Sequence, residues 1–349
     1  MNDKTMTQAL ELGLDTFGDI TAAQDGSLKH EAEVLRDLVE QGVLADEIGV
    51  DFLGLGEHHR ADFAISAPEI LMSYLAARTS RIKLGTSVTV LSSDDPIRVF
   101  QRFSTLDALS GGRAEITLGR GSFTESFPLF GFKLDQYEVL FEQKLDLLSA
   151  LLNNEVVSWS GQIRPPLKQQ RVFPRVESRP LTCWIGVGGS PESVVRAVTY
   201  NMPMMLAIIG GNPARFKPYV ELYHQACAQM GHEVKPLGVH SPGHVAETDE
   251  EAIEQLWPHY KAFHDRLGRE RGWASMGKET FIQEARSGSL YAGSPETVAR
   301  RIAKTIETLG LSRFDLKYAT GTMPHSQLMK SIELYGTKVM PLVREMVAG

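Results

Sequence analysis

Short apolar runs recur along the chain, and longer amphipathic segments separate them. Most of these runs are apolar on both faces instead of alternating with polar residues; they cover 10–17, 52–57, 82–91, 114–121, 182–189, 202–210, 237–246 and 313–320. Strands of a parallel sheet that is covered by helices have this composition, because neither face meets water. The pattern therefore predicts eight buried parallel strands.

The segments between these runs repeat apolar residues at helical spacing. One predicted helix has Ser66 as its expected N-cap and Pro68 in its first turn, and another closes on Gly111 as a C-terminal cap. Strand and helix alternate about eight times along the 349 residues. This alternation predicts a single α/β domain over residues 1–349, a (β/α)8 TIM barrel.

Two connections are longer than a barrel needs. Residues 153–180, rich in Pro and Arg, are expected to form an insertion before the fifth strand. Residues 247–294, between the seventh strand and the last helices, carry two histidines and two of the four tryptophans. Connections of that length in a compact domain are usually functional, so we expect 247–294 to be an insertion that acts as a lid.

Charge and targeting signals narrow the class of protein. The formal net charge is -7 and the basic residues are scattered, so we expect neither nucleic acid nor a membrane surface as a partner. The opening "MNDKTMTQALELG" lacks the order of a signal peptide, and the apolar runs are strand-sized. Cys183 and Cys227 form no motif. These features predict a soluble cytoplasmic protein.

Polar side chains gather where the predicted strands end, which is where parallel barrels build their sites. They include Asp15 and Thr16, Glu57, His58 and His59, Ser87, Arg120, His240 and His244, and Thr320 to Thr322. Phe17, Phe123, Phe127 and Trp273 could line an apolar pocket beside them, although such aromatic residues are as often part of a core.

The stretch "GVGGSPES" at 186–193 has the features of a phosphate site. Gly188 and Gly189 follow a strand, Ser190 is placed to cap the next helix, and Ser193 adds a hydroxyl group. The alternative is an ordinary Gly-rich turn. A dinucleotide fingerprint is a poor match, since Pro191 stands where the third glycine would be.

Arg120 lies between two glycines at a strand end, where a guanidinium is suited to bidentate phosphate binding. The alternative is a salt bridge at the rim with Glu125 or Asp95.

The adjacent His58 and His59 allow three interpretations. A metal site is disfavoured, because the chain has no H-x-H pair and no H-E-x-x-H motif. An acid–base imidazole is favoured, and only one of the two should face the site because neighbouring strand residues point to opposite sides. The third interpretation is a structural histidine anchored to Glu57 or to a carbonyl group. With no evident nucleophile and no metal, a phosphorylated cofactor is the best carrier of the chemistry.

The chain resembles the bacterial luciferase-like monooxygenase family over nearly its whole length, least in 247–290. The resemblance rests on "GEHHR", on "LGTSVTVLSSDDPIRVFQRFSTLDALSGGRAEITLGRGS", on "FPLFGF" and on the closing "GSPETVARRI" and "MPHSQLMKSIELYGTKVMPLVRE". It implies a TIM barrel that binds reduced FMN, or in one branch a deazaflavin, and that forms a homodimer or a higher homo-oligomer.

The resemblance also assigns roles by motif. His58 matches the active-site histidine beside the flavin ring. Ser87 and Val88 match a strand-end bulge behind the ring, often with a non-proline cis peptide. The phosphate-binding positions are matched by Arg120, Gly189, Ser190 and Ser193, in agreement with the turn that begins at Gly188.

Two departures exclude a transfer of bioluminescence or of aldehyde specificity. The light-emitting α subunit has a cysteine where this chain has Gly119, and an acidic residue where this chain has Gly189. His325 is placed near the pocket as a feature of a subgroup, with capping of the last helix by Ser326 as the equal alternative.

The resemblance predicts a two-component monooxygenase. An NAD(P)H-flavin reductase would supply reduced FMN, and dioxygen would be used to oxygenate a small organic substrate. The alternatives are a deazaflavin-dependent hydride-transfer enzyme, a flavin-binding protein without catalysis and, last, a metal-dependent hydrolase.

Overall fold

The computed structural model describes residues 9–177 and 180–348. The first eight residues, which include most of the segment judged not to be a signal peptide, lie outside it. Eight parallel strands close into a barrel, because β9 and β10 pair at the two ends of the order β10-β12-β1-β2-β3-β5-β8-β9. The strands are β1 (Glu11–Thr16), β2 (Phe52–Leu55), β3 (Lys83–Thr86), β5 (Ala114–Gly119), β8 (Thr182–Val187), β9 (Met204–Ala207), β10 (Leu237–Val245) and β12 (Arg313–Lys317). The predicted TIM barrel and all eight predicted strands are confirmed.

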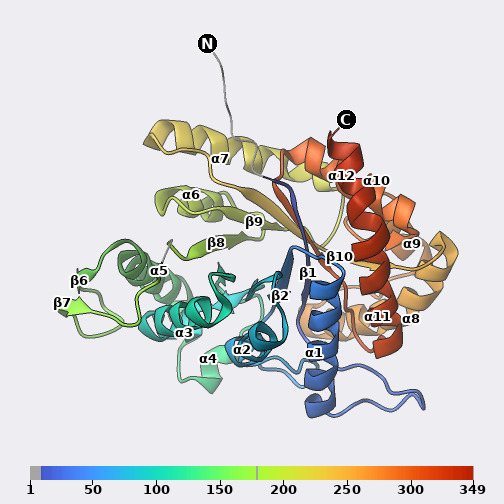
Figure 1. Ribbon diagram of the computed structural model, residues 1–349, viewed down its shortest axis with the longest axis horizontal. Coiled ribbons are helices and arrows are strands. Elements are labelled where there is room, and N and C mark those ends of the chain that lie inside the picture. Colours follow the sequence, from blue (N-terminus) through green and yellow to red (C-terminus); the bar gives the residue numbers. More distant parts are fainter. Residues whose placement is uncertain (1–8, 178–179, 349) are drawn as a thin grey trace.

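Helices surround the barrel (Figure 1). They are α1 (Glu31–Glu47), α2 (Pro68–Arg78), α3 (Pro96–Ser110), α4 (Ser126–Leu129), α5 (Tyr137–Asn153), α6 (Pro191–Thr199), α7 (Lys217–Met230), α8 (Asp249–Arg271), α9 (Lys278–Ser287), α10 (Pro295–Leu309), α11 (His325–Leu334) and α12 (Met340–Ala348). A π-helical turn, Tyr335–Val339, joins the last two. Among the described residues no helix is long and apolar enough to cross a membrane.

The ends of two helices test the expected caps. Gly111 ends α3 in the left-handed region at φ 68°, as predicted, and glycine adopts that conformation without a steric penalty. Pro68 opens α2 as predicted, but Ser66 is not its cap: Ala67 holds that position without a side-chain hydrogen bond. The proline fixes the start of the helix by its own φ and needs no capping hydroxyl there.

The third predicted strand is interrupted. β3 ends at Thr86, the Ser87–Val88 peptide bond is cis, and the chain resumes as β4 (Thr89–Val90), which pairs with β5. The structure thus contains the strand-end bulge and the cis peptide bond that the family resemblance implied at Ser87 and Val88.

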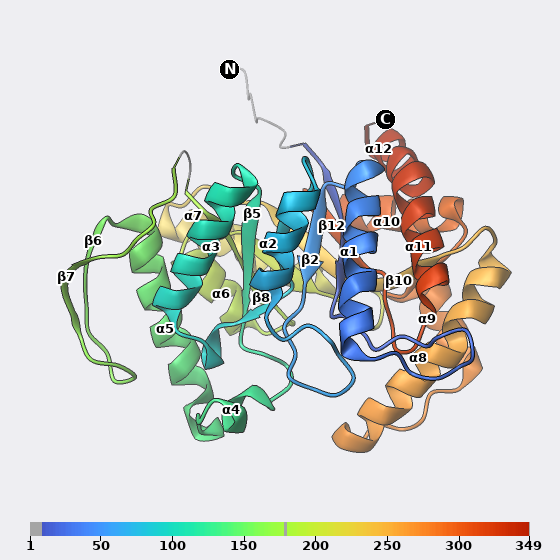
Figure 2. The ribbon, with the colours of Figure 1, turned by 60° about the horizontal axis from the view of Figure 1, so that its bottom comes forward.

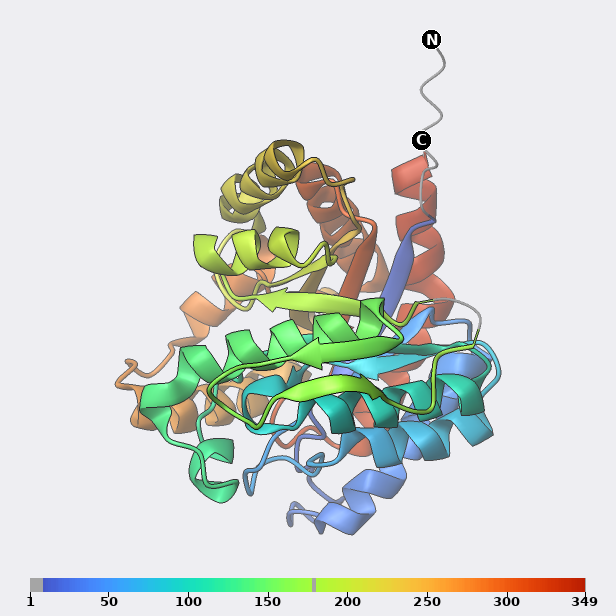
Figure 3. The ribbon, with the colours of Figure 1, turned by 90° about the vertical axis from the view of Figure 1, so that its left-hand side faces the viewer.

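The segment before the fifth barrel strand forms an antiparallel hairpin, β6 (Val156–Trp159) and β7 (Leu167–Arg171). It lies on the outside of the barrel (Figure 3). Trp159 anchors it to α5, since the indole Nε1 donates a 2.8 Å hydrogen bond to Asp146.

The second long connection is mostly helical. It contains α8 and α9, which are followed by a short strand, β11 (Tyr291–Gly293), that pairs with β10. In Figure 2 the strands run downward, and α4 and α8 lie at the lower end, where the strands finish. The connection is therefore at the end of the barrel that parallel barrels use for their sites.

Candidate active site

Four neighbouring strands deliver the predicted site residues to one end of the barrel. β2, β3, β5 and β8 are consecutive in the sheet, and all run parallel. His58 follows β2, Ser87 and Val88 follow β3, Arg120 follows β5, and the turn 188–193 follows β8. The topology therefore places these residues along one arc of the barrel mouth.

His58 lies in an aromatic cluster. Its ring stacks on Phe63 at 4.5 Å between centroids and meets Phe17 and Phe123 edge-on at 4.7 and 5.1 Å. Its Nδ1 is 3.9 Å from a carboxylate oxygen of Glu125. Burial raises the pKa of Glu125, but the nearby His58 and hydrogen bonds from backbone N–H groups outweigh that effect and lower it overall. His58 is thus an imidazole in apolar surroundings with a carboxylate within reach.

His59 has a different set of partners. Its Nε2 donates a 2.8 Å hydrogen bond to Glu57, and its ring meets Phe130 edge-on. The hydrogen bond to Glu57 is the main reason that the pKa of His59 is raised. The second oxygen of Glu57 accepts a 3.0 Å bond from the backbone N–H of Val90. Glu57, which the sequence offered as an anchor for His58, therefore binds His59. The same carboxylate connects the end of β2 to the segment after the β3 bulge.

Val88 fills the space between two strand ends. A Cβ atom at Gly119 would overlap Val88 Cγ2, and one at Gly186 would stand 3.4 Å from Val88 Cγ1. The space that a side chain at position 119 would need is thus occupied by a valine methyl group from the neighbouring strand end.

The turn after β8 has the geometry expected of a phosphate cradle. Gly189 adopts φ +100°, which other residues rarely do, and its carbonyl accepts a 2.7 Å bond from Tyr219. Ser190 caps α6, and its hydroxyl lies 2.8 Å from that of Ser193. A Cβ atom at Gly188 would meet nothing within 4 Å. Open space, two hydroxyl groups and a helix N-terminus fit a phosphate group.

Arg120 forms an ion pair with Glu138 of α5 and lies over the Tyr137 ring. The alternative considered from the sequence, a salt bridge of Arg120 at the rim, is therefore present, but the partner is neither Glu125 nor Asp95. Glu125 faces His58, and Asp95 caps α3. Glu138 lies 18 residues after Arg120 and on a different element, so the spacing of residues around Arg120 does not reveal this pair.

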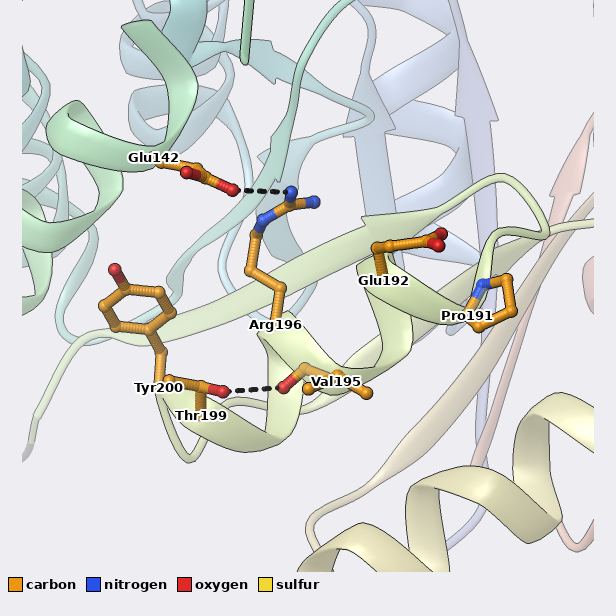
Figure 4. A pocket seen from close by; sticks show the side chains of 7 residues that line it. All are labelled: Glu142, Pro191, Glu192, Val195, Arg196, Thr199 and Tyr200. Atoms are coloured by element: carbon orange, nitrogen blue, oxygen red, sulfur yellow. Dashed lines mark hydrogen bonds and ion pairs between the residues drawn. The ribbon is translucent and has the colours of Figure 1, made fainter. Parts of the chain in front are cut away.

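A hollow on the outer side of α6 lies next to this network (Figure 4). Its arginine, Arg196, pairs with Glu142 at 3.2 Å and with Glu138 at 3.5 Å. The cation of the hollow is therefore already neutralised, and Glu138 is shared between Arg120 and Arg196.

The remaining sequence expectations have mixed outcomes. Phe17 and Phe123 contact His58, whereas Phe127 is fully buried against Tyr137 and Trp273 is 45% exposed. His325 is not at the mouth: it packs on α1, where it contacts Gln41 and Glu40. Ser326 is not a cap either, since Pro324 holds that position.

Several residues at this end of the barrel were not identified from the sequence or were given no role there. Asp15 and His240 form a buried pair at 2.6 Å, and Arg60, Asp62, Arg266 and Glu270 join the loop after β2 to α8 by ion pairs. No local signal identifies them, because the members of each set are far apart in the sequence.

Comparison with known proteins gives consistent matches. A family model described as luciferase-like monooxygenase matches residues 16–313. The alkanal monooxygenase alpha chain of Photorhabdus luminescens is 24% identical over an alignment of 365 positions, gaps included, that covers 94% of this chain and 98% of that protein.

Two solved structures share the fold. One is the oxygenating constituent of 3,6-diketocamphane monooxygenase of Pseudomonas putida in complex with FMN, with a TM-score of 0.75, 19% identity and coverage of 95% of this chain and 98% of that one. The other is an F420-dependent secondary alcohol dehydrogenase in complex with an F420-acetone adduct, with a TM-score of 0.73, 15% identity and coverage of 96% and 99%.

Proposed function

Because the chain belongs to the luciferase-like monooxygenase family, we propose that it is a flavin-dependent monooxygenase that uses reduced FMN and dioxygen to oxygenate a small organic substrate. The observation that carries the proposal is the arc of four adjacent strand ends, which brings an imidazole, the β3 bulge, an arginine and a phosphate-type turn to one mouth. Reduced flavin, when bound, supplies the electrons for the activation of oxygen.

The residues divide into binding and chemical groups. Gly188, Gly189, Ser190 and Ser193 would hold the FMN phosphate, with Arg120 released from Glu138 to bind it. Ser87 and Val88 would support the ring. His58 would hydrogen-bond or transfer a proton at the reacting edge, as its position among three phenylalanines supports.

Helix α8 would act as the lid. Arg271 donates a hydrogen bond to the carbonyl of Ser122 and lies over the Phe123 ring, so the helix reaches the aromatic cluster around His58. Closure over a reduced cofactor excludes water from the site.

Reduced FMN would come from a separate NAD(P)H-flavin reductase, in the cytoplasm. Both cysteines are buried and free, as suits a reducing compartment. Deazaflavin-dependent hydride transfer is the alternative, since one of the structures with the same fold binds F420. The whole-length sequence similarity to alkanal monooxygenase favours oxygen chemistry.

An anaerobic titration tests the choice of cofactor. The protein is titrated with reduced FMN, oxidised FMN and reduced deazaflavin, and each complex is then exposed to air. We expect tight binding of reduced FMN and a spectrum that changes with oxygen more slowly than that of free flavin. A preference for deazaflavin, with no response to oxygen, would contradict the proposal and support hydride transfer. A flavin that binds yet supports oxidation of no substrate in the presence of a reductase would support a binding protein.

Two variants separate the roles. Arg120→Ala should weaken the binding of reduced FMN roughly tenfold or more, because a charged hydrogen bond contributes about 1.5–3 kcal/mol. His58→Ala should slow turnover roughly 100-fold and leave flavin affinity largely intact. A fully active His58→Ala enzyme would remove His58 from the mechanism.

We also propose a homodimer formed through α2 and α3. Ile70 and Tyr74 lie one turn apart on α2 and are 73% and 55% exposed, and Leu109 of α3 is 71% exposed. Burial of such side chains favours association. Light scattering should give a dimer for the wild type and a monomer for Ile70→Glu; a monomeric wild type would contradict the proposal.

A further inference from the structure

Two ionisable side chains inside the barrel have no role in the chemistry proposed above. Asp15 is on β1 and His240 is on β10, with β12 between them in the sheet. The imidazole Nδ1 lies 2.6 Å from Asp15 Oδ2. A carboxylate can only accept, so Nδ1 donates the hydrogen and Nε2 is the nitrogen left for other chemistry.

The pair has one open end. Asp15 is fully buried, and its other oxygen, Oδ1, has no hydrogen-bond partner within the described part of the chain. The His240 side chain keeps 9% of its surface exposed, and no described residue hydrogen-bonds its Nε2. The exposed part of the pair is therefore its imidazole.

That open end is next to the proposed site. The ring of Phe17 stacks over His240 at 5.9 Å and meets His58 edge-on at 4.7 Å, so one aromatic side chain separates the two imidazoles. A Cβ atom at Gly56 would overlap the Phe17 ring and would stand 2.7 Å from the carbonyl oxygen of Ser87. The glycine thus brings Phe17 close to the bulge proposed to support the flavin.

Charged groups from neighbouring strands face the pair. Asp315 of β12 pairs with His240 in the strand register. Burial raises the pKa of Asp315 to about 7 although Arg313 lowers it; the charge of Asp15 raises this pKa and that of His240 lowers it. Arg313 binds Asp315 at 3.0 Å and Glu115 at 2.7 Å. Lys317 lies over Phe17 and pairs with Asp19 at 3.2 Å.

A barrel interior is normally filled with branched apolar side chains. Here glycines make room for acids: a Cβ atom at Gly13 would overlap the Asp315 carboxylate, and one at Gly54 would lie 3.0 Å from Asp15 Cβ. Burial of such groups is unfavourable unless they are paired, and among the described residues the Asp15 carboxylate accepts one hydrogen bond, from His240. Packing alone therefore does not explain why acidic side chains occupy this part of the barrel interior.

We infer that Asp15 and His240 form a second acid–base pair of this site, which delivers a proton from His240 Nε2 toward the reacting centre; the inference rests on the proposed monooxygenase function. Asp15 orients the imidazole and stabilises its protonated form, while His58 acts on the other side of Phe17.

The reaction requires such a proton. Reduced, anionic flavin, when bound, would supply two electrons, and the substrate would supply the other two. One oxygen atom of dioxygen forms the new bond to the substrate, and the other leaves as water. That water would take one hydrogen from the reduced flavin and one proton from elsewhere. The N–H bond of His240 breaks, the proton goes to the departing oxygen, and solvent restores it after the site opens.

Chemical labelling tests access to the pair without turnover. Diethylpyrocarbonate modifies unprotonated imidazole nitrogens, and peptide mass spectrometry reports each histidine. In the flavin-free protein His240 should react more slowly than His30, whose side chain is 74% exposed, and faster than the fully buried His244. Oxidised FMN should then protect His240 at least fivefold. No reaction at His240, or no protection by bound FMN, would overturn the inference.

Variants test the proton transfer. His240→Asn should lower turnover roughly 100-fold while the affinity for reduced FMN changes less than about threefold. Imidazole added to the buffer should restore part of the activity, which it would not do for a structural defect. Asp15→Asn should lower turnover less, because it acts through His240. His232→Asn, in which the lost imidazole hydrogen-bonds the Val198 carbonyl, is the matched control and should be fully active.

The two proposals fail in different ways. A wild-type protein that binds no flavin would contradict the proposed function, and the inference with it. A flavin-binding, active wild type with an equally active His240→Asn variant would overturn the inference alone. If His240→Asn does not fold, the labelling of the wild type decides.

Discussion

At the scale of single residues, Glu57 links the two strand ends on which the site depends. One oxygen of the carboxylate binds the His59 imidazole, and the other binds the Val90 backbone. The side chain is 10% exposed, so these bonds replace nearly all of its contact with water. Its neighbour His58 is thereby left free of the carboxylate.

Replacement of Glu57 should reveal a pH-dependent contribution to stability. Because Glu57 raises the pKa of His59, the stabilisation is fully present below the ordinary histidine pKa of about 6.5 and is lost as pH rises through the raised value. Glu57→Gln should therefore lower the free energy of unfolding by about 1.5 kcal/mol at low pH and by less at high pH. Urea unfolding at pH 5.5 and 9 measures this. The difference between the two pH values should vanish in a His59→Gln background; persistence there would assign it to another group.

At the scale of elements, close approaches between strands and helices shape the mouth. The β3 bulge packs on the end of β5 through Val88 and Gly119. Helix α8 is held to the loop after β2 by Asp62, which accepts from Arg60 at 3.1 Å and from Arg266 at 2.6 Å. Arg60 in turn binds Glu270 at 2.7 Å.

The contact between the bulge and β5 predicts a compensating pair of substitutions. Gly119→Ala should destabilise the protein by about 1–3 kcal/mol, because the new methyl group overlaps Val88. Val88→Ala in the same chain should recover much of the loss by making room. Gly210→Ala is the control, since a Cβ atom there meets nothing. Additive effects in the double variant, measured by urea unfolding, would contradict this account.

The ion pairs between α8 and the loop after β2 predict that this helix can be loosened without a change in the rest of the barrel. Asp62→Asn should increase hydrogen exchange of the backbone in 259–271, and high salt should reduce the difference from the wild type. Lys261→Ala removes the Lys261–Asp265 pair on the same helix and should leave the end of the helix at the mouth unchanged. Equal exchange in the two variants would show that Asp62 does not hold the helix.

At the scale of the whole molecule, a buried ionic cluster joins strands across the barrel interior. Arg313 is 1% exposed, binds Glu115 and Asp315, and lies 3.4 Å above the centre of the Phe52 ring. Trp184 donates a 3.1 Å hydrogen bond to Glu115. These residues come from β12, β5, β2 and β8, so the cluster connects strands on different sides of the barrel.

Removal of the cation should destabilise the entire barrel. Arg313→Met removes the cation that binds Asp315 and leaves Glu115 with Lys83 and Trp184, so it should lower the free energy of unfolding by about 3–5 kcal/mol. Arg300→Met, on the exposed face of α10, is the control and should change it by less than about 0.5 kcal/mol. Urea unfolding followed by circular dichroism measures both. A small effect of Arg313→Met would mean that the carboxylates take up protons at little cost.

The limits of the sequence prediction can be followed in particular elements. The eight strands were found because parallel strands are apolar on both faces, and Gly111 was found because only glycine readily adopts that conformation. Helices α8 and α9 were missed: α8 is highly charged and contains Pro258, and both features hide a helical pattern. The hairpin β6–β7 was expected only as an insertion.

The sequence by itself determined the barrel, the strand ends and the residue types at the mouth, because local periodicity and turn residues carry that information. The tertiary structure decided which of these residues meet. It assigned Glu57 to His59, Arg120 to Glu138 and Asp15 to His240, and it placed α8 beside Phe123. Such partners lie on different elements, so their contacts depend on closure of the barrel and not on spacing along the chain.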